Sequence, residues 1–186
     1  MSAQLERWHF NVDQYYRLAE AGVLQPDDRV ELIEGEIIRV PPIGSPHAAR
    51  VTRISYILRD VFERRAIISV QDPVRLDDFS EPVPDVALLQ PREDFYAAQH
   101  PTPKDVLLIV EVSDSTTFTD RNVKVPLYAR AEIPEVWLVN LPKQVIEVYS
   151  EPAEGKYQKA KTFSLDEVLT SPTLANLSLR VEEIIG

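Results

Sequence analysis

Two carboxylates within apolar segments are the residues of this sequence best suited to chemistry. Glu111 is the single charged residue in the apolar run 106–112, and Asp85 follows a proline and precedes the apolar run 86–89. An ionised carboxylate inside an apolar strand is costly unless a cation or strong hydrogen-bond donors compensate it. Two such carboxylates at neighbouring strand ends suit Mg²⁺, which binds few protein carboxylates and keeps several waters. The pair therefore predicts a site for Mg²⁺, or for Mn²⁺ in its place.

Lys124 is the candidate third member of this site, because it lies on the element that follows the Glu111 strand. Its ammonium could orient an attacking water or neutralise charge that develops on a phosphate. The structural alternative for Lys124 is a surface ion pair with Asp120, four positions earlier. For Glu111 the alternative is a satisfied structural charge, and for Asp85 it is a turn or capping role.

One hairpin segment offers a fourth carboxylate. Glu31, Glu34 and Glu36 crowd the segment 29–40, and most of them must be ordinary solvated positions. Sequence alone does not decide which of the three approaches the cleft. Glu31 is the preferred candidate, since it directly precedes two apolar residues.

A locally basic helix supplies the candidate contacts to nucleic acid. The whole chain carries 30 acidic and 20 basic side chains, whereas residues 47–75 contain six arginines and three acidic residues. Because affinity for DNA depends mainly on phosphate contacts, we expect binding at one helix face, with His47, Arg50 and Arg53 as contacts. The alternatives are a polar helix-start role for His47 and a solvated surface for the arginines.

Composition excludes several classes of protein. Cysteine is absent and three histidines are scattered, which excludes disulfides and argues against a histidine-built zinc site. The chain has no glycine-rich phosphate loop and no GxSxG elbow, so a P-loop nucleotide hydrolase is excluded and a serine triad is poorly supported. Apolar runs are too short for a membrane helix, and the amino terminus lacks the apolar stretch of a signal peptide. We therefore expect no membrane association and a cytoplasmic location.

The pattern of apolar residues predicts a mixed α/β architecture, and the length of 186 residues suits a single domain over 1–186. The strongest apolar segment, 106–112, is expected to be a central strand. The tail 157–185 is expected to form a strand, a helical turn and a last strand. The other expected elements are helices at 11–24, 47–65 and 123–130, a hairpin at 29–40, and strands at 67–70, 74–76, 85–89, 135–140 and 145–150.

Six short segments match one known protein family in their order along the chain. They are RVELIEGEII (29–38), PIGSPHAA (42–49), VPDVA (83–87), IVEVSDS (109–115), KVPLYAR (124–130) and IPEVWLV (133–139). The sequence from about residue 11 to residue 150 thereby resembles the Uma-two family, whose members are described as restriction endonucleases.

The resemblance implies a PD-(D/E)xK, restriction-endonuclease-like fold, in which a central mixed β-sheet is flanked by helices and preceded by an amino-terminal helix and hairpin. It also implies magnesium-dependent hydrolysis of DNA phosphodiester bonds. Asp85 and Glu111 match the two acidic motif residues, and Glu31 matches an acidic residue of the amino-terminal region. The motif lysine is expected at position 113, where the sequence has Ser113. The resemblance implies that Lys124 supplies this lysine from the following helix.

A second function of another class is compatible with the same residues. The acidic net charge and the missing in-strand lysine could belong to a catalytically inactive nuclease-like fold that serves as a DNA-binding or protein-assembly module. A homodimer is expected only on general grounds, because symmetric dimers are the commonest soluble oligomers.

Overall fold

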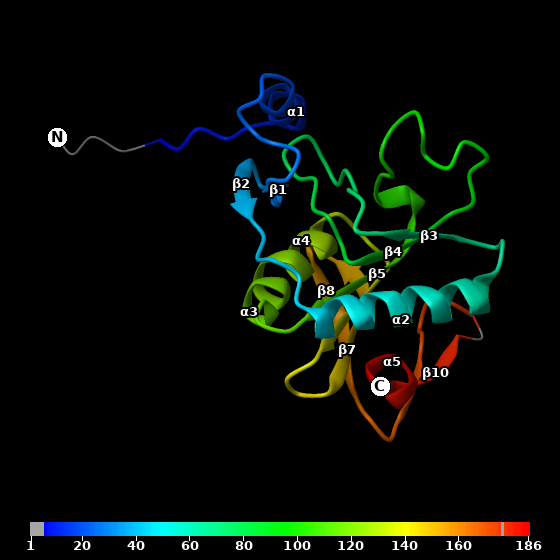
Figure 1. The fold of residues 1–186 in the computed structure, drawn as a ribbon. Coiled ribbons are helices and arrows are strands. Elements are labelled where there is room, and N and C mark those ends of the chain that lie inside the picture. The colour runs from blue at the N-terminus through cyan, green and yellow to red at the C-terminus, as the bar shows by residue number, and fades with distance from the viewer. Residues whose placement is uncertain (1–5, 176) are drawn as a thin grey trace.

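A six-stranded mixed sheet forms the centre of the molecule (Figure 1). The computed structural model describes residues 6–175 and 177–186. Strands β5 and β6 pair in parallel, and the other neighbouring pairs of this sheet are antiparallel. In spatial order the strands are β3 (Ile67–Val70), β4 (Val86–Leu89), β5 (Val106–Ser113), β6 (Glu135–Asn140), β7 (Val145–Ala153) and β8 (Lys156–Ser164). The predicted fold class is thereby confirmed.

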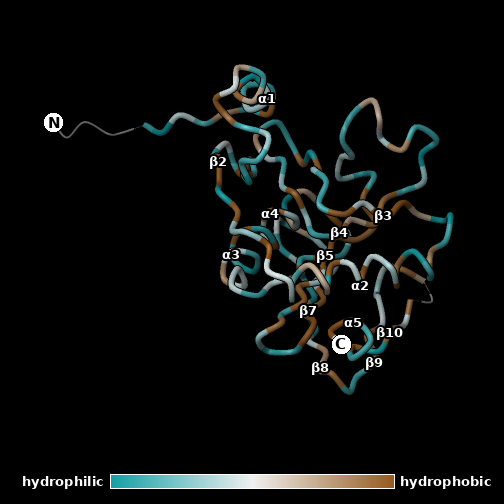
Figure 2. Tube along the Cα trace, viewed as in Figure 1, coloured by the Kyte–Doolittle hydropathy of each residue, from teal (hydrophilic) through white to brown (hydrophobic). Residues whose placement is uncertain are grey.

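Helices cover both faces of this sheet. Helices α2 and α5 contribute to the hydrophobic core on one face, and α4 contributes to the core on the other. In Figure 2 hydrophobic residues gather along the sheet strands, whereas the turns that project from them are mostly hydrophilic. The helical segments are α1 (Val12–Glu20), α2 (Ser45–Phe62), η1 (Pro103–Asp105), α3 (Thr117–Thr119), η2 (Asp120–Lys124), α4 (Val125–Arg130) and α5 (Val181–Ile185).

Helix α2 shows why this sequence forms a helix with one buried face. Val51, Ile54 and Leu58 are buried and recur at helical spacing, so they form one apolar stripe. This stripe packs against β3, β4 and β5. Pro46 stands in the first turn, where its missing N–H costs no helical hydrogen bond.

Strand β5 is covered on both faces and carries Glu111 near its carboxyl end. Val110 and Val112 belong to the core beneath α2, whereas Ile109 belongs to the core beneath α4. Because side chains alternate along a strand, Glu111 shares the α4 side of the sheet with Ile109. The crossover from β5 to its parallel neighbour β6 runs through α3, η2 and α4, which places these segments beside Glu111.

The amino-terminal hairpin pairs β1 (Val30–Ile33) with β2 (Glu36–Arg39). Its two-residue turn has positive φ at both positions, 50° at Glu34 and 79° at Gly35, as a tight hairpin requires. A Cβ atom on Gly35 would lie 2.6 Å from Cβ of His9, so glycine is required here for close approach as well. A bridge between Leu32 and Glu81 joins the hairpin to the segment before β4.

Two expectations for secondary structure are wrong. Residues 74–76 form no strand, because the segment between β3 and β4 folds back on itself through hydrogen bonds from Val74 N to Pro82 O and from Leu76 N to Ser80 O. The tail contains the strand pair β9 (Val168–Thr170) and β10 (Ser178–Arg180) and ends in helix α5. The apolar residues of α5 lie at helical spacing and are buried beneath α2. No helix in the described ranges is long and apolar enough to cross a membrane.

Candidate active site

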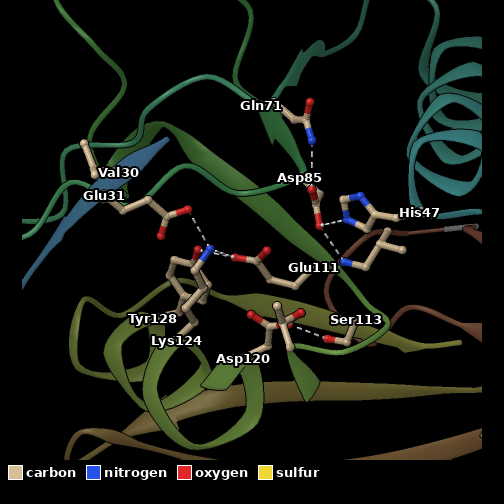
Figure 3. A network of polar contacts seen from close by, with 12 residues as sticks. Val30, Glu31, His47, Gln71, Asp85, Glu111, Ser113, Asp120, Lys124 and Tyr128 are labelled. Atoms are coloured by element: carbon tan, nitrogen blue, oxygen red, sulfur yellow. Dashed lines mark hydrogen bonds and ion pairs between the residues drawn. The ribbon is translucent and has the colours of Figure 1, made fainter. Parts of the chain in front are cut away.

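Four predicted residues from four separate segments border one cleft of about 540 Å³. Glu31 comes from β1, Asp85 directly precedes β4, Glu111 lies in β5, and Lys124 ends the π-helical turn η2. All four are at most 9% exposed. Figure 3 shows Glu31, Glu111 and Lys124 pointing toward one another, with Asp85 on the other side of Glu111. The structure therefore brings together the four residues that the sequence predicted for the catalytic site.

Lys124 lies between two carboxylates that line this cleft. Its Nζ is 3.0 Å from Oε1 of Glu31 and 3.3 Å from Oε1 of Glu111. The hydroxyl of Tyr128 donates a hydrogen bond of 2.6 Å to the same Oε1 of Glu111. The alternative of a surface ion pair with Asp120 is wrong, because both residues are buried and the ion pairs of Lys124 run to the two glutamates.

Asp85 is held by three donors from different segments. Its Oδ2 lies 2.9 Å from Nε2 of His47 and accepts a hydrogen bond of 2.8 Å from the backbone N–H of Val112. Its Oδ1 accepts a hydrogen bond of 3.2 Å from the Gln71 side chain. These contacts fix the orientation of the carboxylate at the edge of the cleft.

The site holds more acidic groups than cations. Burial raises the pKa of Glu111 to about 8 against the opposing effect of Lys124, and Asp85 adds to the rise. Burial also raises the pKa of Glu31. Burial by itself would lower the pKa of Lys124, but the nearby carboxylates, Glu111 foremost, outweigh it and raise that pKa. Lys124 is therefore a permanent cation at neutral pH and not a proton acceptor.

The donor set fits a hard divalent cation that keeps part of its water shell. Asp85 and Glu111 offer carboxylate oxygens on the same cleft. An added cation would offset the burial and the neighbouring acids that raise the pKa of Glu111. Across residues 6–175 and 177–186, no three His, Cys, Asp or Glu side chains form a group that could hold a metal. Water or phosphate oxygens would have to complete the coordination of any ion here.

The three predicted DNA contacts separate in the structure. His47 lines the cleft and is hydrogen-bonded to Asp85, so its polar helix-start position serves the site directly. Arg50 instead donates to the backbone oxygen of Gly186 at 3.1 Å, and Arg53 donates to that of Glu183 at 3.4 Å. The two arginines thus join α2 to the end of α5, away from the cleft lining.

The other two hairpin glutamates point elsewhere. Glu34 forms an exposed ion pair of 2.7 Å with Arg130, and Glu36 forms one of 2.9 Å with Arg7. Glu31 is the member of this group that lines the cleft.

Sequence reasoning missed two buried polar residues beside Lys124. Asp120 and Tyr128 lie four positions before and four positions after it, and all three side chains are buried. The spacing of four residues was the available signal, because residues four apart share one face of a helix. Gln71, which contacts Asp85, has no comparable signal, since it lies in a loop.

Comparison with known proteins identifies the family and the fold. A family model described as "Putative restriction endonuclease", that of the Uma-two family, matches residues 12–182. A crystal structure of a putative nuclease belonging to DUF820 from Anabaena variabilis superposes with a TM-score of 0.71 at 19% sequence identity. The match covers 95% of this chain and 97% of that one, and it shows a shared fold. Comparison with curated proteins gives no match.

Proposed function

Because the chain belongs to the Uma-two family of restriction endonucleases, we propose that it hydrolyses DNA phosphodiester bonds with the help of Mg²⁺ or Mn²⁺. The observation that carries the proposal is the convergence of Glu31, Asp85, Glu111 and Lys124 on one cleft. Four segments of the chain contribute to this arrangement. Burying so many charges together is costly, and such clusters in a cleft are typical of functional sites.

Asp85 and Glu111 are the residues that would hold the ion. Bound there, Mg²⁺ would polarise a phosphate oxygen and lower the pKa of a water molecule. The hydrogen bonds from His47, Gln71 and the Val112 N–H keep Asp85 oriented at the edge of the cleft. Tyr128 orients Glu111 in the same way.

Lys124 would stabilise the negative charge that develops on the phosphate during in-line attack. Its raised pKa keeps the ammonium protonated throughout, so its role is electrostatic. Glu31 holds the ammonium 3.0 Å from its own carboxylate and thereby fixes where this positive charge lies. We also propose that the second oxygen of Glu31 contacts the water shell of the ion.

The test is cleavage of plasmid and oligonucleotide DNA in Mg²⁺ or Mn²⁺. Asp85→Asn and Glu111→Gln should abolish cleavage, because each removes a carboxylate from the proposed ion site. Glu34→Gln is the matched control, since Glu34 is an exposed hairpin glutamate paired with Arg130, and this variant should cut at the wild-type rate. Cleavage that persists in both site variants would refute the assignment.

Calorimetric titration with Mn²⁺ separates the nuclease from a non-catalytic module. The proposed site should bind the ion in the wild-type protein and lose it in Asp85→Asn. A wild-type protein that binds no divalent ion, even beside DNA, would favour a DNA-binding or assembly module instead.

A further inference from the structure

Asp120 is a buried acid that the proposed reaction leaves without a role. Its side chain lines the same cleft as Glu111 and Lys124, yet the residue is only 6% exposed. It forms no ion pair within the described ranges. An ionised carboxylate in this setting must be held by hydrogen bonds.

Two hydroxyl groups hold one oxygen of Asp120. Ser113 Oγ, at the end of β5, and Thr116 Oγ1, before α3, each donate a hydrogen bond of 2.6 Å to Oδ2 of Asp120. No hydrogen bond to its other oxygen, Oδ1, is made in the described part of the chain. Figure 3 shows Asp120 between Ser113 and Lys124. The carboxylate therefore joins the end of the Glu111 strand to the segment that carries Lys124.

The backbone between Asp120 and Lys124 is itself unusual. Residues Asp120–Lys124 form a π-helical turn. It is closed by a hydrogen bond from the backbone N–H of Val125 to the backbone carbonyl oxygen of Asp120. Such turns are rare in proteins, and many of those that occur lie at functional sites. Asp120 begins the turn and Lys124 ends it, so fixing the side chain at the start fixes where the turn directs the ammonium at its end.

We propose that Asp120 is a positioning residue for Lys124, held in place by the hydroxyls of Ser113 and Thr116. Ser113 is two residues after Glu111 on the same face of β5, where a lysine would reach the cleft directly. Here the strand supplies a hydroxyl instead, and the following turn supplies the lysine. The placement of Lys124 follows from the structure alone, whereas its effect on DNA cleavage rests on the proposed function.

A matched set of threonine variants tests the positioning. Thr116→Ala removes one hydroxyl from Asp120, Thr116→Ser restores it, and Thr119→Ala makes the same change at an exposed position of the same segment. The readout independent of activity is the NMR signal of the Lys124 side-chain ammonium at low temperature, identified by its loss in Lys124→Arg. We expect the signal to shift or broaden in Thr116→Ala and in Asp120→Asn, and to match wild type in Thr116→Ser and Thr119→Ala.

Cleavage kinetics give the second readout. Thr116→Ala should lower kcat about 10-fold, because the loss of a contact that supports a site residue commonly has an effect of this size. KM should change little, and Thr116→Ser should restore kcat. An unchanged ammonium signal in both Thr116→Ala and Asp120→Asn would overturn the proposal, and so would an equal shift in Thr119→Ala. If the wild-type protein cuts no substrate, the proposed function fails, while the ammonium signal still decides the positioning role. Thr116 is only half-buried, so its variants should fold even if Asp120→Asn does not.

Discussion

Two glutamates buried in neighbouring strands of the central sheet, Glu135 and Glu111, differ in the groups that surround their carboxylates. Glu135 of β6 is fully buried and accepts hydrogen bonds from Trp137 Nε1 at 2.6 Å, Ser171 Oγ at 2.7 Å and both the backbone N–H and the hydroxyl of Thr173. These neutral donors satisfy the carboxylate and fasten the segment before β10 to the sheet. Glu135 is therefore a structural charge.

Glu111 of β5 is almost as deeply buried, but it faces a cleft that it shares with other carboxylates. Its bonds come from the Tyr128 hydroxyl and from Lys124, which it shares with Glu31. Burial therefore does not distinguish the two glutamates. The charge around each carboxylate does, because an excess of acids on an open cleft can be relieved by a ligand, whereas a closed set of neutral donors needs none.

The largest expected effect is on the cleavage rate. The same substitution, glutamate to glutamine, should change this rate at Glu111 and not at Glu135. Glu111→Gln should abolish measurable cleavage, a loss of at least about 100-fold, because it removes a carboxylate from the proposed ion site. Glu135→Gln should leave the rate near that of wild type. Single-turnover cleavage in Mn²⁺ measures both rates. Equal losses in the two variants would show that Glu111 is no more involved in cleavage than Glu135.

Tyr128→Phe should give a smaller loss on the Glu111 side. The variant keeps the buried ring and removes the hydrogen bond to Glu111, so we expect about a 10-fold lower cleavage rate and a weaker Mn²⁺ affinity. Calorimetry and cleavage assays measure the two effects. Tyr157→Phe is the matched control, since its hydroxyl bonds the backbone oxygen of Ile133, outside the cleft. Wild-type Mn²⁺ affinity in Tyr128→Phe would contradict the orienting role.

Stability should respond in the reverse order. Glu135→Gln should lower the free energy of unfolding by about 2 kcal/mol, because an amide cannot accept all the hydrogen bonds that the carboxylate accepts. Glu111→Gln should cost less, because Lys124 keeps Glu31 as its counterion and the amide oxygen can still accept the hydrogen bond from Tyr128. Urea denaturation of both variants measures the difference, and a larger loss in Glu111→Gln would reverse the structural assignment.

The smallest expected effect concerns a third carboxylate, which is paired with a cation. Hydrogen bonds from Arg121 and Tyr149 overcome the effect of partial burial and lower the pKa of Glu147 below its ordinary value. A depressed folded-state pKa contributes stability above the pKa of the unfolded chain, and this stability is lost as the pH falls through the folded value. Melting temperatures measured from pH 6 to pH 3 should therefore fall less in Glu147→Gln than in wild type. Parallel curves would contradict this linkage.

The sequence was a good guide where one residue carried its own signal. Glu111 and Asp85 were conspicuous because they are charges beside apolar strands, and α2 was evident from its helical spacing. The site depends on contacts that periodicity cannot show, however. Nothing in the sequence indicated that Arg50 and Arg53 would bind backbone oxygens near α5, because those oxygens are more than a hundred residues away. The predicted dimer and cellular location stay predictions.

The contacts of Asp120 could not be predicted from the sequence. Its spacing of four from Lys124 is equally typical of a surface ion pair and of two buried groups on one helical face. The hydrogen bonds from Ser113 and Thr116 decide between them, and they depend on how the chain leaves β5. Local spacing cannot report that path, because it is set by the parallel pairing of β5 with β6.

The ion pair between Lys124 and Glu31 also bears on the order in which the site assembles. These residues are 93 positions apart, whereas Tyr128 and Glu111 are 17 positions apart. Closing the longer loop costs more chain entropy, and contacts between distant segments form more slowly than local ones. During refolding, Glu111 and Tyr128 should therefore meet while β5 and the crossover form. We therefore expect the site to gain Glu31 last, when the hairpin docks, so the complete charge cluster should form only at the end of refolding.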